Sequence, residues 1–121
     1  MEEKAGEVFS IAKDNMPVPG CTISKEVHGG ENGIIYFSLA KNTDISAEIF
    51  PYHKLLIVAE GSLEVYETNG YRKVLHAGDS VLTSTDIPIG MKTDTGAVYT
   101  EIEIRRSDIM NEAIKAGEVF R

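Results

Sequence analysis

The side chains that could carry out chemistry are few and lie far apart in the sequence. The chain has three histidines and one cysteine: His28, His53, His76 and Cys21. No two histidines stand at the short spacing of metal ligands, and one cysteine allows neither an internal disulfide nor a cysteine-cluster zinc site. Cys21 has no adjacent base that would activate it. We therefore expect ordinary structural roles for these four residues.

Short β-strands are the elements that must position any site. The predicted strands are rich in β-branched and aromatic residues and are separated by turn residues. They cover residues 33–40, 54–60, 62–68, 71–77, 79–84 and 97–105. Between the third and fourth, Asn69-Gly70 predicts a hairpin with a type I′ turn.

Alternation along the strands predicts which side chains face the core. In the last strand Ile102 and Ile104 alternate with Glu101 and Glu103. We expect the isoleucines to face inward and the glutamates to form a solvated face. In the run LLIVA at 55–59 both alternating sets of side chains are apolar, so both faces of this strand need to be covered. The second cover is either another sheet or a partner subunit.

The end of the chain reads as a short helix. SDIMNEAIKAG at 107–117 begins with an N-cap serine and ends on a glycine suited to the C′ position. Its apolar side consists of Ile109, Met110, Ala113 and Ile114. We expect this helix to pack on a domain formed by residues 1–106, with residues 118–121 as a tail.

One hexapeptide occurs twice. KAGEVF stands at residues 4–9 and again at 115–120. Such a repeat favours one unit of a tandem array, and chance identity of two short turns is the alternative.

Composition limits the class of protein and its partners. The 121 residues suffice for one domain, with 42% hydrophobic and 26% charged residues. The 12 basic and 19 acidic side chains give a net charge of −7, which disfavours nucleic acid as a partner. No apolar run is long enough to cross a membrane, and the acidic start is unlike a signal peptide. We expect a cytoplasmic protein that binds neither nucleic acid nor membranes.

The stretch EGSLEVYETNGYRKVLHAGDSVL at residues 60–82 resembles the cupin family. The family pattern has a strand ending in Glu-Gly, a second strand, a hairpin, and an Ala-Gly-Asp turn before the next strand. The resemblance extends over residues 33–105 and implies an all-β, cupin-type double-stranded β-helix, a jelly-roll barrel. It also implies a homodimer, and in many members a divalent metal inside the barrel.

The positions that bind metal in the family are altered in this sequence. Counted back from Gly61, its two histidines and glutamate fall on Glu48, Phe50 and Lys54. Counted forward from Gly78, the last histidine falls on Ile89. One carboxylate beside a phenyl ring, an isoleucine and an ammonium cannot hold a first-row metal. We therefore expect no metal and no other cofactor.

The same register brings Glu48 and Lys54 into the barrel. There they would form an ion pair in place of the metal and orient a small polar ligand, with Phe50 and Ile89 as the apolar wall. A slip of one residue would leave both charges solvated at the barrel mouth. His53 has the opposite strand parity from Lys54 and should point away from the cavity.

Three functions are compatible with these features. The first is a metal-free cupin that binds a small polar molecule as a sensor or accessory module. The second is a small-molecule enzyme of isomerase, lyase or dioxygenase type, with or without metal, using Lys54 or His53 for proton transfer. The third is a structural or dimerisation module, as one unit of a tandem cupin. The sequence does not identify the ligand or substrate.

Overall fold

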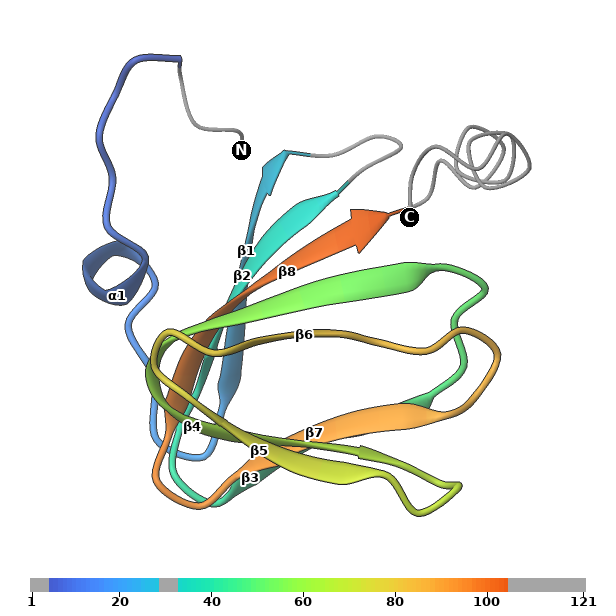
Figure 1. The fold of residues 1–121 in the computed structure, drawn as a ribbon. Coiled ribbons are helices and arrows are strands. Elements are labelled where there is room, and N and C mark those ends of the chain that lie inside the picture. Colours follow the sequence, from blue (N-terminus) through green and yellow to red (C-terminus); the bar gives the residue numbers. More distant parts are fainter. Residues whose placement is uncertain (1–4, 29–32, 105–121) are drawn as a thin grey trace, which may run out of the picture.

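A computed structural model describes residues 5–28 and 33–104 of the chain (Figure 1). It contains one short helix and eight strands. They are α1 (Ile11–Asp14), β1 (Thr22–His28), β2 (Ile34–Leu39), β3 (Thr43–Glu48), β4 (His53–Glu67), β5 (Arg72–His76), β6 (Ser80–Leu82), β7 (Ile89–Thr93) and β8 (Ala97–Ile104). The helix predicted at 107–117, the tail, and most of the repeated KAGEVF lie outside the described residues.

The eight strands form one curled, antiparallel sheet in the order β1-β2-β8-β4-β7-β3, with β5 and β6 also paired to β4 (Figure 1). The first half of β4 pairs with β8 and β6, and its second half pairs with β7 and β5. We call the first group, with β1 and β2, sheet 1, and the second group, with β3, sheet 2. The two sheets face each other as an all-β jelly-roll barrel, as expected.

A glycine allows β4 to pass from one sheet to the other. The sequence suggested two strands separated at Glu60-Gly61, but the structure has one strand with an irregular register between Val58 and Glu60. Gly61 has a φ of 74°, and a Cβ added there would lie 2.0 Å from the carbonyl oxygen of Gly96. A side chain is therefore excluded on two grounds, backbone conformation and space.

The hairpin between β4 and β5 lies where Asn69-Gly70 predicts it. The turn type is wrong, because a type I′ turn needs a positive φ at both central residues. Gly70 has a φ of 104°, whereas Asn69 is not among the described residues with positive φ. The Asn69 side chain instead accepts a hydrogen bond from the amide of Tyr71. Strands β1, β3 and β7 were not predicted from the sequence.

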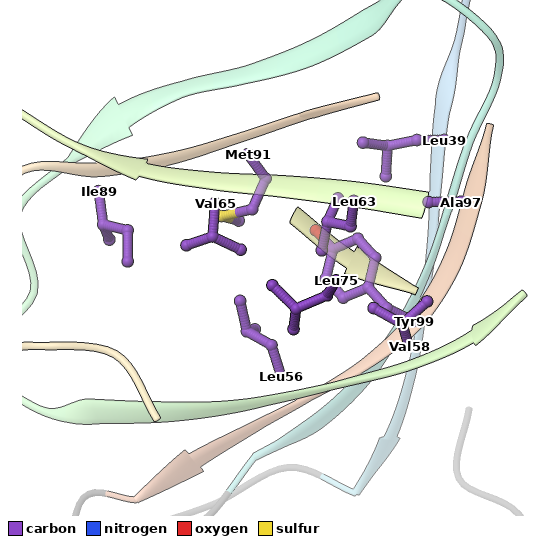
Figure 2. Packing of buried hydrophobic residues seen from close by; sticks show 10 residues of the cluster. All are labelled: Leu39, Leu56, Val58, Leu63, Val65, Leu75, Ile89, Met91, Ala97 and Tyr99. Carbon is purple, nitrogen blue, oxygen red and sulfur yellow. The ribbon is translucent and has the colours of Figure 1, made fainter. Parts of the chain in front are cut away.

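The core fills the space between the two sheets. Figure 2 shows its members converging from both sides, with the ring of Tyr99 reaching in from β8. The cluster comprises Leu39, Leu56, Val58, Leu63, Val65, Leu75, Ile89, Met91, Ala97 and Tyr99. From the LLIVA run, Leu56 and Val58 point into this core, while Leu55 and Ile57 lie half-buried on the outer face of sheet 1.

The segment before β1 packs against the outer face of sheet 1 (Figure 1). The side chain of Asn15 is buried and donates hydrogen bonds to the carbonyl oxygens of Ile23 and Tyr36 and to the hydroxyl of Ser38. The Ser38 hydroxyl in turn donates to the carbonyl of Asn15. Part of this face is thus covered by the chain's own N-terminal segment. None of the helical structure in residues 5–28 and 33–104 is long and apolar enough to cross a membrane.

Candidate functional site

The most unusual feature of the barrel interior is a buried pair of opposite charges. Lys54 lies on the inward face of β4 and is 6% exposed, and Glu101 lies on the inward face of β8 and is 3% exposed. The Lys54 Nζ is 3.4 Å from the Glu101 Oε1. It also sits 3.3 Å from the centroid of the Phe50 ring, a cation–π geometry. The ammonium is therefore held between a carboxyl group and an aromatic face.

The inward position of Glu101 corrects the parity expected for the last strand. Glu101 is buried and Glu103 lies on the same face, whereas Ile102 and Ile104 lie on the outer face. The pairing of β8 with β4 sets this register, since Leu56 stands opposite Glu101. Alternation alone does not say which face of a strand is inside when both faces carry a cover.

Burial controls the charge state of Glu101. Loss of hydration raises the pKa of its carboxyl, because the charged form is disfavoured in the interior. The Lys54 ammonium lowers this pKa, and the negative charges of Glu103 and Glu48 raise it further. The net effect is a raised pKa. Glu101 therefore holds its proton more tightly than a solvated glutamate does.

Two aromatic rings border the charged pair. The ring centroids of Phe50 and Tyr52 are 5.6 Å apart, with the planes tilted by 49°. The Tyr52 hydroxyl donates a hydrogen bond of 3.1 Å to Glu103. This end of the barrel thus combines an ammonium, two inward carboxyl groups and an aromatic wall.

Glu48 is not the partner of Lys54. It is the last residue of β3, its side chain is exposed, and it acts on the site through its charge. An irregular register between Ile45 and Glu48 shifts the end of β3 against β7. Ile89, paired with Glu48 along the backbone, is buried in the core. Of the four residues predicted to bind a ligand, Lys54 and Phe50 lie in direct contact. Ligand binding by all four stays a prediction.

Tyr99 places a further polar group in the interior, two residues before Glu101. Its ring stacks on Phe37 with the centroids 5.1 Å apart. Its hydroxyl is buried, and no hydrogen-bond partner lies within reach among the described residues. Burial and the charge of Glu101 both raise the pKa of Tyr99, so its hydroxyl keeps its proton.

His53 and His76 do not join this site. His53 has the opposite parity from Lys54, as expected, and its Nδ1 lies 2.7 Å from the carbonyl oxygen of Thr83. His76 is exposed at the end of β5. Among residues 5–28 and 33–104, no three His, Cys, Asp or Glu side chains are placed to hold a metal. Lys54, Phe50 and Ile89 offer no lone pairs to an ion, so the residues present do not fit the family's metal.

A cavity of about 500 Å³ lies at the other end of sheet 1. It is lined by Pro17, Pro19, Gly20, Leu39, Ala40, Lys41, Glu60, Gly61, Thr95, Gly96, Ala97 and Val98. These residues belong mainly to turns, and the only charged ones, Lys41 and Glu60, are exposed. The buried charges and the raised pKa of Glu101 lie at the opposite end of sheet 1. We regard the Lys54–Glu101 end as the candidate site.

Comparison with known proteins gives the fold but no activity. No protein-family model matches the sequence, and no curated protein matches it either. Among solved structures, a conserved Streptococcus pyogenes protein of unknown function has a TM-score of 0.79 at 16% identity, covering 87% of this chain and 92% of that one. A cupin superfamily protein from Desulfitobacterium hafniense has a TM-score of 0.77 at 12% identity, covering 85% and 94%.

An uncharacterised Klebsiella pneumoniae protein with a double-stranded β-helix domain has a TM-score of 0.71 at 17% identity, covering 83% of this chain and 90% of that one. These similarities cover 83–87% of the chain and agree with the fold described above. The resemblance seen in residues 60–82 is therefore confirmed at the level of structure: the chain has the fold of a small cupin.

Proposed function

We propose that the barrel binds a small, uncharged polar molecule at the Lys54–Glu101 end, and that the domain serves as a sensor or accessory module. The observation that carries this proposal is the buried charged pair. Removing two charges from water costs several kcal/mol per ion, and a well-packed apolar pair at the same place is often equally or more stable. Folding alone gives no reason to keep Lys54 and Glu101 there.

The chemistry of the pair suggests the class of ligand. The Lys54 ammonium donates hydrogen bonds, and the Glu101 carboxyl accepts them or, when protonated, donates one. Because the two charges largely offset each other, a neutral molecule with neighbouring donor and acceptor groups fits better than an ion. Carboxamides and polyols have this arrangement. Phe50 and Tyr52 would cover the apolar part of such a molecule.

Thermal unfolding in the presence of defined probes tests the proposal. The probes are small carboxamides and polyols, each compared with the carboxylate and the amine of equal size. We expect neutral probes to raise the melting temperature of the natural protein, because a ligand that binds only the folded state stabilises it. The double variant Lys54→Met/Glu101→Gln should lose this shift, whereas Lys92→Met, which removes an exposed cation, should keep it. If no neutral probe shifts the natural protein, or if the shift persists in the double variant, the site is wrong.

An enzymatic function has one observation in its favour. A carboxyl group with a raised pKa, next to an ammonium, is a possible general acid or base. Glu101 would then take the role for which the sequence suggested Lys54 or His53. Of these two, His53 faces away from the barrel interior. Turnover of any probe by the natural protein, and its loss in Glu101→Gln, would support this alternative.

A further inference from the structure

The cavity at the other end of sheet 1 has one wall that is fixed by a turn of the N-terminal segment. A hydrogen bond of 2.9 Å from the Cys21 amide to the Val18 carbonyl oxygen closes this turn. Pro19 and Gly20 lie at its centre, and Gly20 has a φ of 75°. Proline followed by a residue of positive φ is the combination that a type II turn favours. This wall is therefore held in place by the backbone itself.

The opposite wall forms where β4 passes between the two sheets. The Ser62 amide donates a hydrogen bond of 3.2 Å to the Gly96 carbonyl oxygen, and the Gly96 amide donates one of 2.9 Å to the Thr93 hydroxyl. Gly61 and Gly96 have φ values of 74° and 100°. Because neither glycine has a side chain, backbone alone borders the cavity at these two positions.

The floor of the cavity is apolar. Leu39, Ala97 and Val98 line it and are buried. Leu39 stands opposite Ala97 on the neighbouring strand, and Figure 2 shows the two side by side at one end of the core. Pro17 and Pro19 add apolar surface from the N-terminal segment. A volume of about 500 Å³ lies within the range of about 300–1,000 Å³ that is typical of small-molecule sites, so the cavity suits a ligand with an apolar body.

Two opposite charges stand at the rim. Lys41 and Glu60 line the cavity, and both side chains are exposed. Within residues 5–28 and 33–104, neither side chain forms an ion pair or a hydrogen bond. Gly96 lies between them, since a Cβ added there would be 3.9 Å from the Lys41 amide nitrogen, and a Cβ on Gly61, next to Glu60, would meet the Gly96 carbonyl. The rim thus offers one ammonium and one carboxylate, on either side of Gly96.

We propose that this cavity is a second binding site and that it takes an apolar α-amino acid in its zwitterionic form. The apolar side chain of the ligand lies on the floor formed by Leu39, Ala97 and Val98. Its carboxylate pairs with Lys41 and its ammonium with Glu60. A ligand with a single charge would leave one rim charge unmatched or place it beside a like charge. The site is separate from the Lys54–Glu101 end and does not depend on what binds there.

Isothermal titration of the full-length chain with phenylalanine and three matched probes tests the ligand class. N-acetylphenylalanine lacks the ammonium, phenylalaninamide lacks the carboxylate, and glycine lacks the apolar side chain. The titrations are run at about pH 6.5, where an α-amino group is charged. We expect phenylalanine to bind most tightly, and each missing charge to weaken binding roughly 1.5- to 5-fold, the range of an exposed ion pair. Glycine should show no measurable binding, because burial of apolar surface supplies most of the affinity.

Two variants assign each charge of the ligand to its partner. Lys41→Met should weaken the binding of phenylalanine and N-acetylphenylalanine but not that of phenylalaninamide. Glu60→Gln should weaken the binding of phenylalanine and phenylalaninamide but not that of N-acetylphenylalanine. Lys73→Met, which removes an exposed cation of β5, is the matched control and should leave all affinities unchanged.

Amide NMR spectra locate the bound ligand. The signals of Gly20, Gly61 and Gly96 should move as phenylalanine is added, whereas that of Gly70, in the hairpin after β4, should stay in place. The double variant Lys54→Met/Glu101→Gln should bind phenylalanine as the natural protein does. This variant separates a failure of the present proposal from a failure of the function proposed for the barrel interior.

Several results would overturn the proposal. They are a lack of saturable binding of phenylalanine, an affinity for glycine or for either singly charged probe equal to that for phenylalanine, and binding that neither Lys41→Met nor Glu60→Gln weakens. Loss of phenylalanine binding in the Lys54→Met/Glu101→Gln variant would place the ligand in the barrel interior instead. The crossed response of the two rim variants, together with the shifts of the three glycine signals, would support the proposal.

Discussion

Removal of the Lys54 ammonium should destabilise the protein in a way that depends on pH. Lys54→Met keeps most of the apolar stem of the side chain and leaves Glu101 buried without its cation. Breaking a buried pair by removing one partner costs about 3–5 kcal/mol when the remaining group stays charged. Protonation of Glu101 relieves this penalty, so the cost depends on the pKa of that carboxyl.

The direction of the pH dependence follows from the causes of that pKa. Burial raises the pKa of Glu101 above its ordinary value of 4.5, and Lys54 lowers it. In Lys54→Met the pKa of Glu101 is therefore higher still. A group whose pKa is raised in the folded state contributes stability that is fully present below its pKa in the unfolded state. That stability is lost as the pH rises through its pKa in the folded state. The variant should lose more stability than the natural protein as pH rises from about 4.5 toward 8.

Urea unfolding at about pH 5 and about pH 8 measures this difference. We expect Lys54→Met to cost about 3–5 kcal/mol at the higher pH and distinctly less at the lower one. The double variant Lys54→Met/Glu101→Gln should recover most of the loss and show no such pH dependence, because Glu101 no longer contributes a buried carboxylate. Lys92→Met is the control, since this exposed cation pairs with the solvated Glu64 and its removal should change little. A cost for Lys54→Met that is equal at both pH values, or a double variant as unstable as the single one, would refute the reasoning.

Three further substitutions test the packing around the site. Tyr99→Phe removes a buried hydroxyl that has no partner among the described residues. Urea unfolding should therefore show a stability that is unchanged or increased by up to about 1–3 kcal/mol. A loss of stability would reveal a hydrogen-bond partner of this hydroxyl. Gly61→Ala should lower the free energy of unfolding by more than about 2 kcal/mol, because the backbone is strained and the new Cβ clashes. Gly78→Ala is the control and should cost about 1 kcal/mol, since Gly78 has a φ of 93° but lies in open space. Equal costs would contradict the role given to Gly61 in the passage of β4 between the sheets. Asn15→Ala should lower stability by about 1–3 kcal/mol, because the buried Ser38 hydroxyl loses its hydrogen-bond donor. It should also speed proteolysis of the segment before β1. Unchanged proteolysis would mean that the Asn15 side chain is not needed to hold this segment on the sheet.

The site was only partly predictable, for a reason that lies in β8. The motif register correctly placed Lys54 inside the barrel, beside Phe50. It paired Lys54 with Glu48 because both fall on metal-binding positions of the family pattern, whereas the actual partner is 47 residues away on a neighbouring strand. One signal could have indicated Glu101: a buried lysine needs a carboxylate, and the last strand carries two on one face.

The sequence by itself determined the local features: short strands with turn glycines, the hairpin at Asn69-Gly70, and a pattern at residues 60–82 that is typical of the cupin fold. These features depend on residues near one another in the chain, where backbone preferences act directly. Tertiary structure alone decided which face of β8 is inside, since strand alternation has two solutions and only pairing with β4 selects one. That choice places Glu101 against Lys54, because burial and charge at a site depend on strands that meet in space.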